Sequence, residues 1–223
     1  MYIIVIGLGG IGRNLVGFSS RKGENVVVID QNESRCADVL EHHDVLALTG
    51  NATNKAVLED AGIERADALV ATTSDDAVNL MTCWLAKRFN VPNVVSIVNQ
   101  PEHSDLFDEV GVVISENPDE LVASRLYFWA QNPSMHQLAK IPGGTIFQIP
   151  VERGAPFINH RIKEMDVKDF VFIAIRRGSG KLIIPSGSVR ILEDDTIWVF
   201  TREESEKKTI ESLKKKLKAP KIS

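Results

Sequence analysis

The chain has 223 residues, of which 43% are hydrophobic and 25% are charged, and its formal net charge is −4 at pH 7. This length suits one large or two small domains of a folded, soluble protein. The acidic balance gives no electrostatic reason to expect binding to nucleic acid or to an anionic membrane. Because no apolar run approaches the ~20 residues needed to cross a bilayer, and no secretory leader is evident, we expect a cytoplasmic protein.

The first thirty residues contain the most informative pattern. The apolar run Tyr2 to Ile6 has the length of a buried strand and leads directly into the turn Gly7-Leu8-Gly9-Gly10-Ile11-Gly12. A helix-compatible stretch follows to about Arg21, and a second apolar run, Val26 to Ile29, ends at Asp30. Strand, glycine turn, helix, strand and acid in this order are typical of the βαβ unit that binds dinucleotides.

Each residue type in this unit has a physical role. Gly7 permits a tight turn, Gly9 has no Cβ to block a pyrophosphate, and Gly12 lets the helix pack closely on the strand. The free N–H groups and the positive end of the helix dipole would attract phosphates, while Asp30 would accept hydrogen bonds from ribose hydroxyls. A purely structural strand-to-helix turn is the alternative interpretation.

The alternation of strands and helices continues beyond Asp30. Further strands are predicted at 45–48, 68–71, 94–98 and 112–114, and helices at 33–41, 54–61, 77–89 and 104–109. Six strands with right-handed crossovers predict a Rossmann-like α/β domain with an open, doubly wound parallel sheet.

Small polar residues gather at the carboxyl ends of these predicted strands, where such sheets bind ligands. They are Asp30, Asn51, Thr53, Thr72, Thr73, Ser74 and Asn99. Any one of them could simply cap the next helix. Their occurrence at four strand ends favours a ligand-binding rim.

A predicted helix from Pro118 to Gln131 has more apolar residues than one narrow face holds, which favours a swapped or dimer-forming element over burial within its own chain. We place a domain boundary near 133–140, so that residues 1–133 form the first domain and 134–223 a small β-rich α+β domain. Its predicted strands are 145–151, 171–176, 182–185 and 196–200, with a short helical piece at 162–165 and a charged helix at 203–218.

The sequence offers no recognisable catalytic arrangement. A dehydrogenase needs an acid or base beside the nicotinamide and a pocket for a second substrate. His103 is the one histidine near a predicted strand end, and the sequence assigns it no carboxylate partner. Cys36 and Cys83 are not at metal-ligand spacing and are expected to be reduced structural thiols, so we expect no metal site. A nucleotide site without a reaction favours a sensor that is not an enzyme.

Several stretches carry a resemblance that covers nearly the whole chain. They are the glycine turn with Asp30, Gly50-Asn51-Ala52-Thr53, Thr72-Thr73-Ser74-Asp75-Asp76 with Asn79, Val98-Asn99, and 111–115, 171–178, 184–187 and 192–197 in the later part. With these motifs the chain resembles the cytosolic regulatory subunits of potassium-uptake systems, the TrkA/KtrA-type proteins, which consist of an RCK N-domain and an RCK C-domain. The run of two threonines, a serine and two aspartates is the most specific motif.

The resemblance implies a set of cofactor contacts: Gly7, Leu8, Gly9, Gly10, Ile11, Gly12, Asp30, Asn51, Ala52, Thr73, Ser74 and Asn99. NAD or NADH is the favoured ligand, and ATP or ADP is the alternative, because ATP-responsive relatives often have arginine in the glycine turn where this chain has Gly10. Asp30, followed by the non-basic Gln31, disfavours NADP.

The resemblance also implies partners and a mode of action. Such subunits form homodimers and rings, tetrameric or octameric, beneath a membrane-embedded potassium-translocating subunit at the inner face of the cell membrane. Nucleotide exchange would change the ring's shape and so gate transport. A soluble NAD-dependent oxidoreductase remains the alternative function, and the second domain could sense its own ligand, such as a cyclic dinucleotide. Some relatives bind a divalent cation, for which the candidates here are Glu116, Asp119 and Glu120, although acids also favour a helix start.

Overall fold

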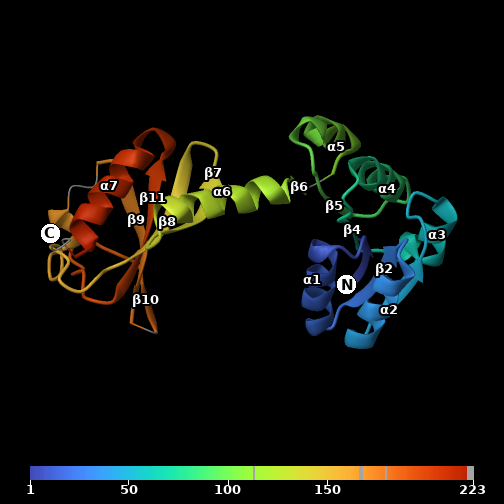
Figure 1. The fold of residues 1–223 in the computed structure, drawn as a ribbon, viewed down its shortest axis with the longest axis horizontal. Helices are drawn as coiled ribbons and strands as arrows, with labels where there is room; N and C mark the ends of the chain where they lie inside the picture. Colours follow the sequence, from blue (N-terminus) through green and yellow to red (C-terminus); the bar gives the residue numbers. More distant parts are fainter. Residues whose placement is uncertain (113, 166–167, 179, 220–223) are drawn as a thin grey trace. The chain divides into compact units, whose positions relative to one another are not determined.

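The computed structural model describes residues 1–112, 114–165, 168–178 and 180–219, and at 114–116 only the backbone. The chain divides into two compact units, Met1–Leu121 and Val122–Ser223 (Figure 1). Each unit has its own sheet and its own hydrophobic core.

The first unit is built on six strands. They are β1 Tyr2–Ile6, β2 Asn25–Asp30, β3 Leu46–Thr49, β4 Ala68–Ala71, β5 Asn93–Ile97 and β6 Ile114–Glu116. All neighbouring pairs are parallel, and the strand order is β3-β2-β1-β4-β5-β6. This confirms the predicted doubly wound sheet, whose strand order reverses between β1 and β4. The last strand begins at Ile114 rather than at Val112, and Val113 lies outside the described residues.

Helices cover both faces of this sheet. They are α1 Gly10–Arg21, α2 Glu33–His42, α3 Lys55–Asp60, α4 Asp76–Arg88 and α5 Ser104–Val110, with short 3₁₀ turns at Ile63–Arg65 and Pro101–His103. Successive strand residues point to opposite faces. Val5 therefore packs with Val16 of α1 and Val39 of α2, whereas Ile4 and Ile6 share the other core with residues of α3, α4 and α5.

The two cysteines lie in these separate cores. Cys36 is 4% exposed and Cys83 is fully buried, and both are free thiols. Burial raises the pKa of Cys83 to about 11, which outweighs the hydrogen bond with Ser96. A thiol with so high a pKa is unreactive at neutral pH, in keeping with the structural role expected for it.

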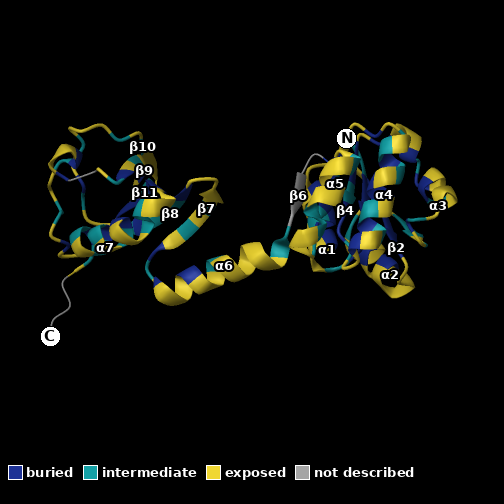
Figure 2. Ribbon diagram, turned by 90° about the horizontal axis from the view of Figure 1, so that it is seen from above, coloured by how far each residue is buried: buried dark blue, intermediate teal, exposed yellow. Residues whose placement is uncertain are grey.

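Helix α6, Pro118–Gln131, has the predicted bounds but contains the division between the two units. Phe128, in its second half, is 6% exposed and stacks on Phe147 of the second unit, with ring centroids 5.1 Å apart. The boundary predicted at 133–140 lies further along the chain than this division, because the sequence does not reveal that Phe128 packs on the later sheet. Most other apolar side chains of α6, among them Leu126 and Trp129, are exposed (Figure 2).

The second unit contains five antiparallel strands in the order β10-β9-β11-β8-β7. They are β7 His136–Ile141, β8 Gly144–Pro150, β9 Phe170–Arg177, β10 Lys181–Ile183 and β11 Asp195–Arg202, and they are accompanied by 3₁₀ turns at Ile162–Glu164 and Glu203–Ser205 and by helix α7 Glu206–Leu217. The predicted β-rich domain is confirmed. Strand β7 was not predicted, because it is a largely exposed edge strand of three polar and three apolar residues that gains its order from pairing with β8 through the turn at Pro142 and Gly143.

Candidate functional site

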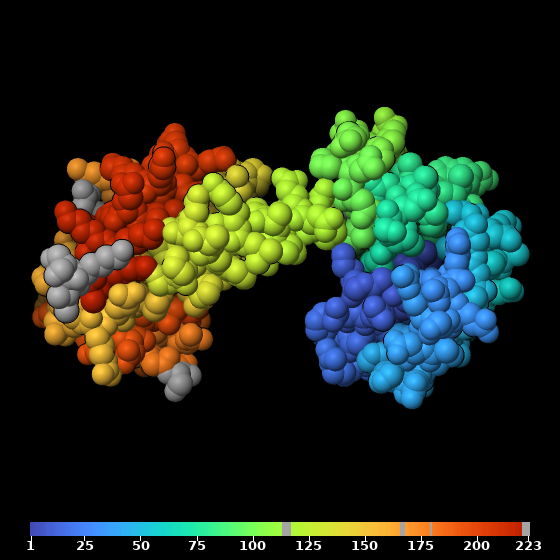
Figure 3. All heavy atoms as spheres, in the orientation of Figure 1, coloured from blue at the N-terminus to red at the C-terminus, as the bar shows by residue number. Residues whose placement is uncertain are grey.

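A cleft of about 830 Å³ lies in the first unit at the carboxyl ends of its strands. In Figure 3 the surface is hollowed where the blue N-terminal elements meet the green ones. The lining comes from the turn after β1, the ends of β2 and β3, the loops after β4 and β5, and the start of α6. This is the position at which the reversal of strand order leaves a crevice in doubly wound sheets.

The glycine turn forms one wall of the cleft. Gly7 has φ +89°, a conformation that favours glycine, and a Cβ on Gly12 would lie only 1.9 Å from the carbonyl oxygen of Gly7. At Gly9 and Gly10, by contrast, an added Cβ would meet no described atom within 4 Å. Within the described chain no side chain caps α1, so no side-chain acceptor takes up its first N–H groups. Such a helix start favours anions.

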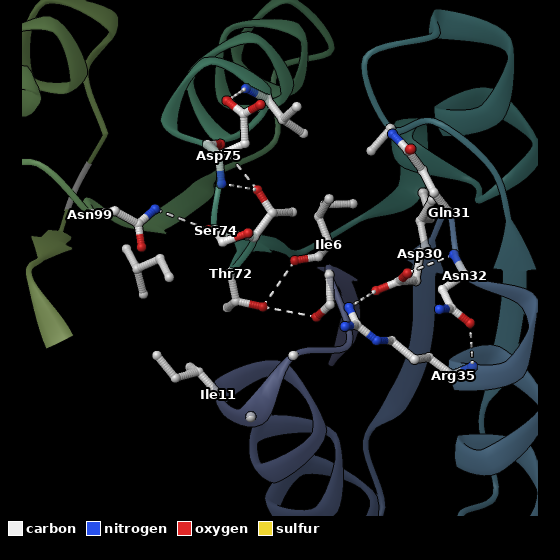
Figure 4. Close-up of a pocket in the computed structure, with 18 of the residues that line it drawn as sticks. Ile6, Ile11, Asp30, Gln31, Asn32, Arg35, Thr72, Ser74, Asp75 and Asn99 are labelled. Atoms are coloured by element: carbon white, nitrogen blue, oxygen red, sulfur yellow. Dashed lines mark hydrogen bonds and ion pairs between the residues drawn. The ribbon is translucent and has the colours of Figure 1, made fainter. Parts of the chain in front are cut away.

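Asp30 closes the neighbouring wall at the end of β2. Its side chain is 8% exposed. Its Oδ2 accepts a hydrogen bond from the Leu8 N–H at 2.6 Å, and its Oδ1 accepts one from the Asn32 N–H at 2.8 Å. Arg35 of α2 forms an ion pair with Oδ2 at 3.7 Å (Figure 4). A carboxylate has about four acceptor positions, so Asp30 is held in place and still has capacity for ribose hydroxyls.

The loop after β4 is tied to the glycine turn. Because β4 pairs with β1, the Thr72 hydroxyl lies 2.9 Å from the carbonyl oxygens of both Ile6 and Gly7. The Thr73 hydroxyl donates to Asn79 Oδ1 at 2.7 Å, and Asn79 is fully buried. Asp75 caps α4 by accepting from the N–H groups of Ala77 and Val78. The most specific motif of the sequence therefore builds a rigid wall.

Asn99 after β5 is positioned by a buried carboxylate. Its amide nitrogen donates to Asp76 Oδ1 at 2.7 Å and to the Thr73 carbonyl oxygen at 3.1 Å. Asp76 is 8% exposed, and its Oδ2 accepts from the Gln100 N–H at 3.0 Å and lies 2.9 Å from His103 Nδ1.

These contacts also set the charge state of Asp76. Burial by itself raises the pKa of this carboxyl, but hydrogen bonds from the Asn99 backbone N–H, His103 and Gln100 outweigh burial, so that the pKa lies below its ordinary value. The carboxylate partner that the sequence did not reveal for His103 is Asp76, at the start of α4.

Comparison with known proteins places this geometry in a family. The TrkA-N domain matches residues 3–118, and the TrkA-C domain matches residues 146–214. The chain belongs to the TrkA family.

Its relatives include two archaeal proteins named Trk system potassium uptake protein TrkA homolog. The one from Pyrococcus abyssi is 31% identical over 91% of this chain and 92% of its own length. The one from Methanothermobacter thermautotrophicus is 29% identical over 88% of this chain and 91% of its own length.

Two solved structures of GsuK share the fold of this TrkA-family chain. The GsuK channel bound to NAD is 20% identical with a TM-score of 0.65, over all of this chain and 40% of the GsuK chain. GsuK bound to ADP is 20% identical with a TM-score of 0.52, over 60% of this chain and 35% of the other. In the part of the TrkA-family chain that the structure describes, no helix is long and apolar enough to span a membrane.

Most of the residues predicted for the site line the cleft of this TrkA-family protein, namely Gly7, Gly9, Gly10, Ile11, Asp30, Ala52, Thr73, Ser74 and Asn99. Three of the predicted cofactor contacts do not line it, and neither does Thr53 of the predicted rim. Leu8 has a fully buried side chain, and Gly12 is buried against Gly7. Asn51 directs its side-chain oxygen to the backbone N–H and hydroxyl of Thr53, at 3.0 and 2.8 Å, which closes a local turn.

Sequence reasoning missed other lining residues, chiefly Gln31, Asn32 and Arg35 after β2 and Pro118 and Asp119 at the start of α6. The signal that could have found them was position, since residues directly following a strand end usually border such a crevice. Of the acids considered for a cation, Asp119 lines the cleft and Glu120 does not, while the side chain of Glu116 lies outside the described residues. Among the described residues, no group of three or more His, Cys, Asp or Glu is placed to hold a metal ion.

Proposed function

We propose that this chain is a nucleotide-sensing regulatory subunit of Trk-type potassium uptake and is not an enzyme. It binds NAD or NADH in the cleft, with ADP or ATP as alternatives, and gates a membrane-embedded potassium-translocating partner. The observation that carries the proposal is the combination of the uncapped α1 start, the glycine turn and the buried Asp30 within a TrkA-family chain. The choice of ligand is supported by the GsuK channel bound to NAD, which shares this fold.

Each wall of the cleft has a role in this proposal. The N–H groups around Gly9 and Gly10 receive the pyrophosphate, and Asp30 accepts from the adenosine ribose. Ala52, Thr73, Ser74 and Asn99 complete the contacts, while the remaining predicted residues, Leu8, Gly12 and Asn51, shape the turns behind them.

The chemistry of the lining favours sensing over catalysis. Asp30 and Asp75 already accept backbone hydrogen bonds, and the only histidine near this rim among the described residues, His103, pairs with Asp76. A general acid or base must be free to exchange a proton with substrate. Sustained hydride transfer by the purified protein would instead support the alternative, an NAD-dependent oxidoreductase.

Exposed apolar side chains support assembly into a homodimer or a larger ring. Met81 and Trp84 on α4, Leu106 on α5, and Leu126 and Trp129 on α6 are each at least 39% exposed. Exposed large apolar side chains on several helices commonly mark contacts with another subunit. We propose that the assembled ring acts in the cytoplasm, where it docks on the inner face of the membrane through its potassium-translocating partner.

Gating requires only that two ligands differ in their affinity for two shapes of the ring. A tenfold difference corresponds to about 1.4 kcal/mol per site, and the contributions of several sites in one ring add. The fold therefore needs no chemical step to convert nucleotide binding into a change in transport.

Thermal unfolding tests the ligand. The purified chain is heated alone and with NAD, NADH, ADP or ATP, and a ligand at 100 times its dissociation constant should contribute about 2.7 kcal/mol, or several degrees. We expect unequal shifts for NAD and NADH, and a smaller shift for Asp30→Ala. Potassium uptake by cells carrying Asp30→Ala then tests gating, and wild-type uptake with an abolished NAD shift would refute the regulatory role.

A further inference from the structure

The charge of the cleft is unusual for a site that receives phosphates. Its lining contains three acids, Asp30, Asp75 and Asp119, and Arg35 is the only lysine or arginine among the described residues that line it. A nucleotide adds further negative charge. The position of this one cation therefore decides how a phosphate-bearing ligand is accommodated.

Arg35 lies in the first turn of α2 and directs its side chain back toward the glycine turn (Figure 4). Its Nη1 is 3.7 Å from Asp30 Oδ2, and the same oxygen accepts the Leu8 N–H at 2.6 Å. Because Asp30 Oδ2 contacts both groups, the Arg35 guanidinium lies close to the Leu8 N–H of the glycine turn. The Arg35 side chain is 49% exposed, so its charged group is accessible from the cleft.

The other arginine near the turn does not serve the cleft. Arg13 belongs to α1, but it does not line the cleft, and its Nη1 lies 3.8 Å from Asp38 Oδ2 on the exposed side of α2. Its side chain is 52% exposed, close to the value for Arg35. The two arginines therefore differ mainly in which acid they face and in whether they border the cleft.

We propose that Arg35 is the phosphate-recognising residue of this site and determines its preference for phosphorylated adenine ligands over adenosine. This inference rests on the proposed function. On binding, the guanidinium exchanges Asp30 for a phosphate oxygen, and Asp30 takes a ribose hydroxyl in its place. The Arg35 side chain is half-exposed and lies 3.7 Å from Asp30, whose carboxylate keeps its hydrogen bonds from Leu8 and Asn32, so the exchange costs less than a charge-assisted bond to a phosphate contributes.

The test compares Arg35→Gln with Arg13→Gln, a matched control that removes the same charge at a similar exposure. Calorimetric titration of the full chain with ADP and with NAD gives the dissociation constants, and adenosine is measured by competition against ADP. We expect Arg35→Gln to raise the constants for ADP and NAD ~10-fold or more, as for loss of a charged hydrogen bond, and to leave adenosine unchanged. Arg13→Gln should change all three by less than about twofold.

Three other outcomes of the titrations would overturn the inference, and each points to a different explanation. An equal loss for adenosine and ADP would mean that Arg35 contacts the base or the ribose, and no loss for either would mean that it contacts no part of the ligand. If Arg13→Gln weakened binding as much as Arg35→Gln, the loss of affinity would be explained by the change in net charge and not by a contact of Arg35. If the wild-type chain binds none of the three ligands, the proposed function fails together with this inference. Arg13→Gln should melt with the wild-type chain, because both side chains of its ion pair are exposed. Arg35→Gln should melt slightly lower, because the buried Asp30 loses an ion-pair partner but keeps its two backbone hydrogen bonds.

Discussion

Replacing Gly12 by alanine tests whether the glycine turn is as tightly built as the distances indicate. The new Cβ would lie 1.9 Å from the Gly7 carbonyl oxygen and 2.7 Å from the Thr72 hydroxyl oxygen. Even weak C–H···O contacts hold carbon and oxygen about 3.3–3.6 Å apart, so α1 must move away from β1 by more than about 1 Å. The obstacle at 1.9 Å is backbone, which cannot rotate aside as a side chain can.

The magnitude follows from two opposing effects. Overpacking costs about 1–3 kcal/mol, occasionally more, and a clash with backbone belongs at the upper end of that range. Alanine regains about 1 kcal/mol of helix propensity inside α1. We therefore expect a net loss of about 2 kcal/mol or more, which in a unit of this size lowers the melting temperature by roughly 8 °C.

The assay is thermal unfolding with and without NAD, and Gly10→Ala is the control. Gly10 also lies in α1, but a Cβ there would meet no described atom within 4 Å, so its melting temperature should stay the same or rise slightly. Gly12→Ala should melt lower and should lose much of the NAD shift, because the turn can no longer present its N–H groups. A Gly12→Ala protein that melts with the wild type and keeps the full NAD shift would refute the steric reasoning.

Two further substitutions test the site and the domain division. Asp76→Asn removes a carboxylate whose pKa is depressed in the folded state, and such a group stabilises the fold above its ordinary pKa of 3.8 and loses that effect as pH falls through the folded value. Urea unfolding should show that the variant has a lower free energy of unfolding than the wild type at pH 7, and that this difference narrows below about pH 4. A difference that does not change with pH would contradict this. Phe128→Ala should destabilise the second unit by about 3–5 kcal/mol while leaving the NAD shift of the first unit intact. Loss of the NAD shift in that variant would mean that the units do not fold independently.

Locally coded features were predictable. The strand at Ala68–Ala71 and the helix at Pro118–Gln131 have their predicted bounds, because an apolar run bordered by polar residues, or a proline at a helix start, acts within a few residues. The glycine turn and Asp30 were found for the same reason, since the spacing of a βαβ unit is a property of one short stretch of chain. Strand β7 was missed because its mixed polar and apolar residues become a strand only through pairing with β8.

The cleft contacts required the tertiary structure. The sequence by itself determined that a glycine turn precedes a helix and that an acid ends the next strand. The placement of β1 between β2 and β4 then brings Asp30 and Thr72 to the glycine turn from opposite sides. The pairs Asp76–His103 and Asp30–Arg35 likewise depend on how helices pack on that sheet. Contacts of this kind depend on distances in space between separate elements, whereas residue patterns report only the conformation of the segment that contains them.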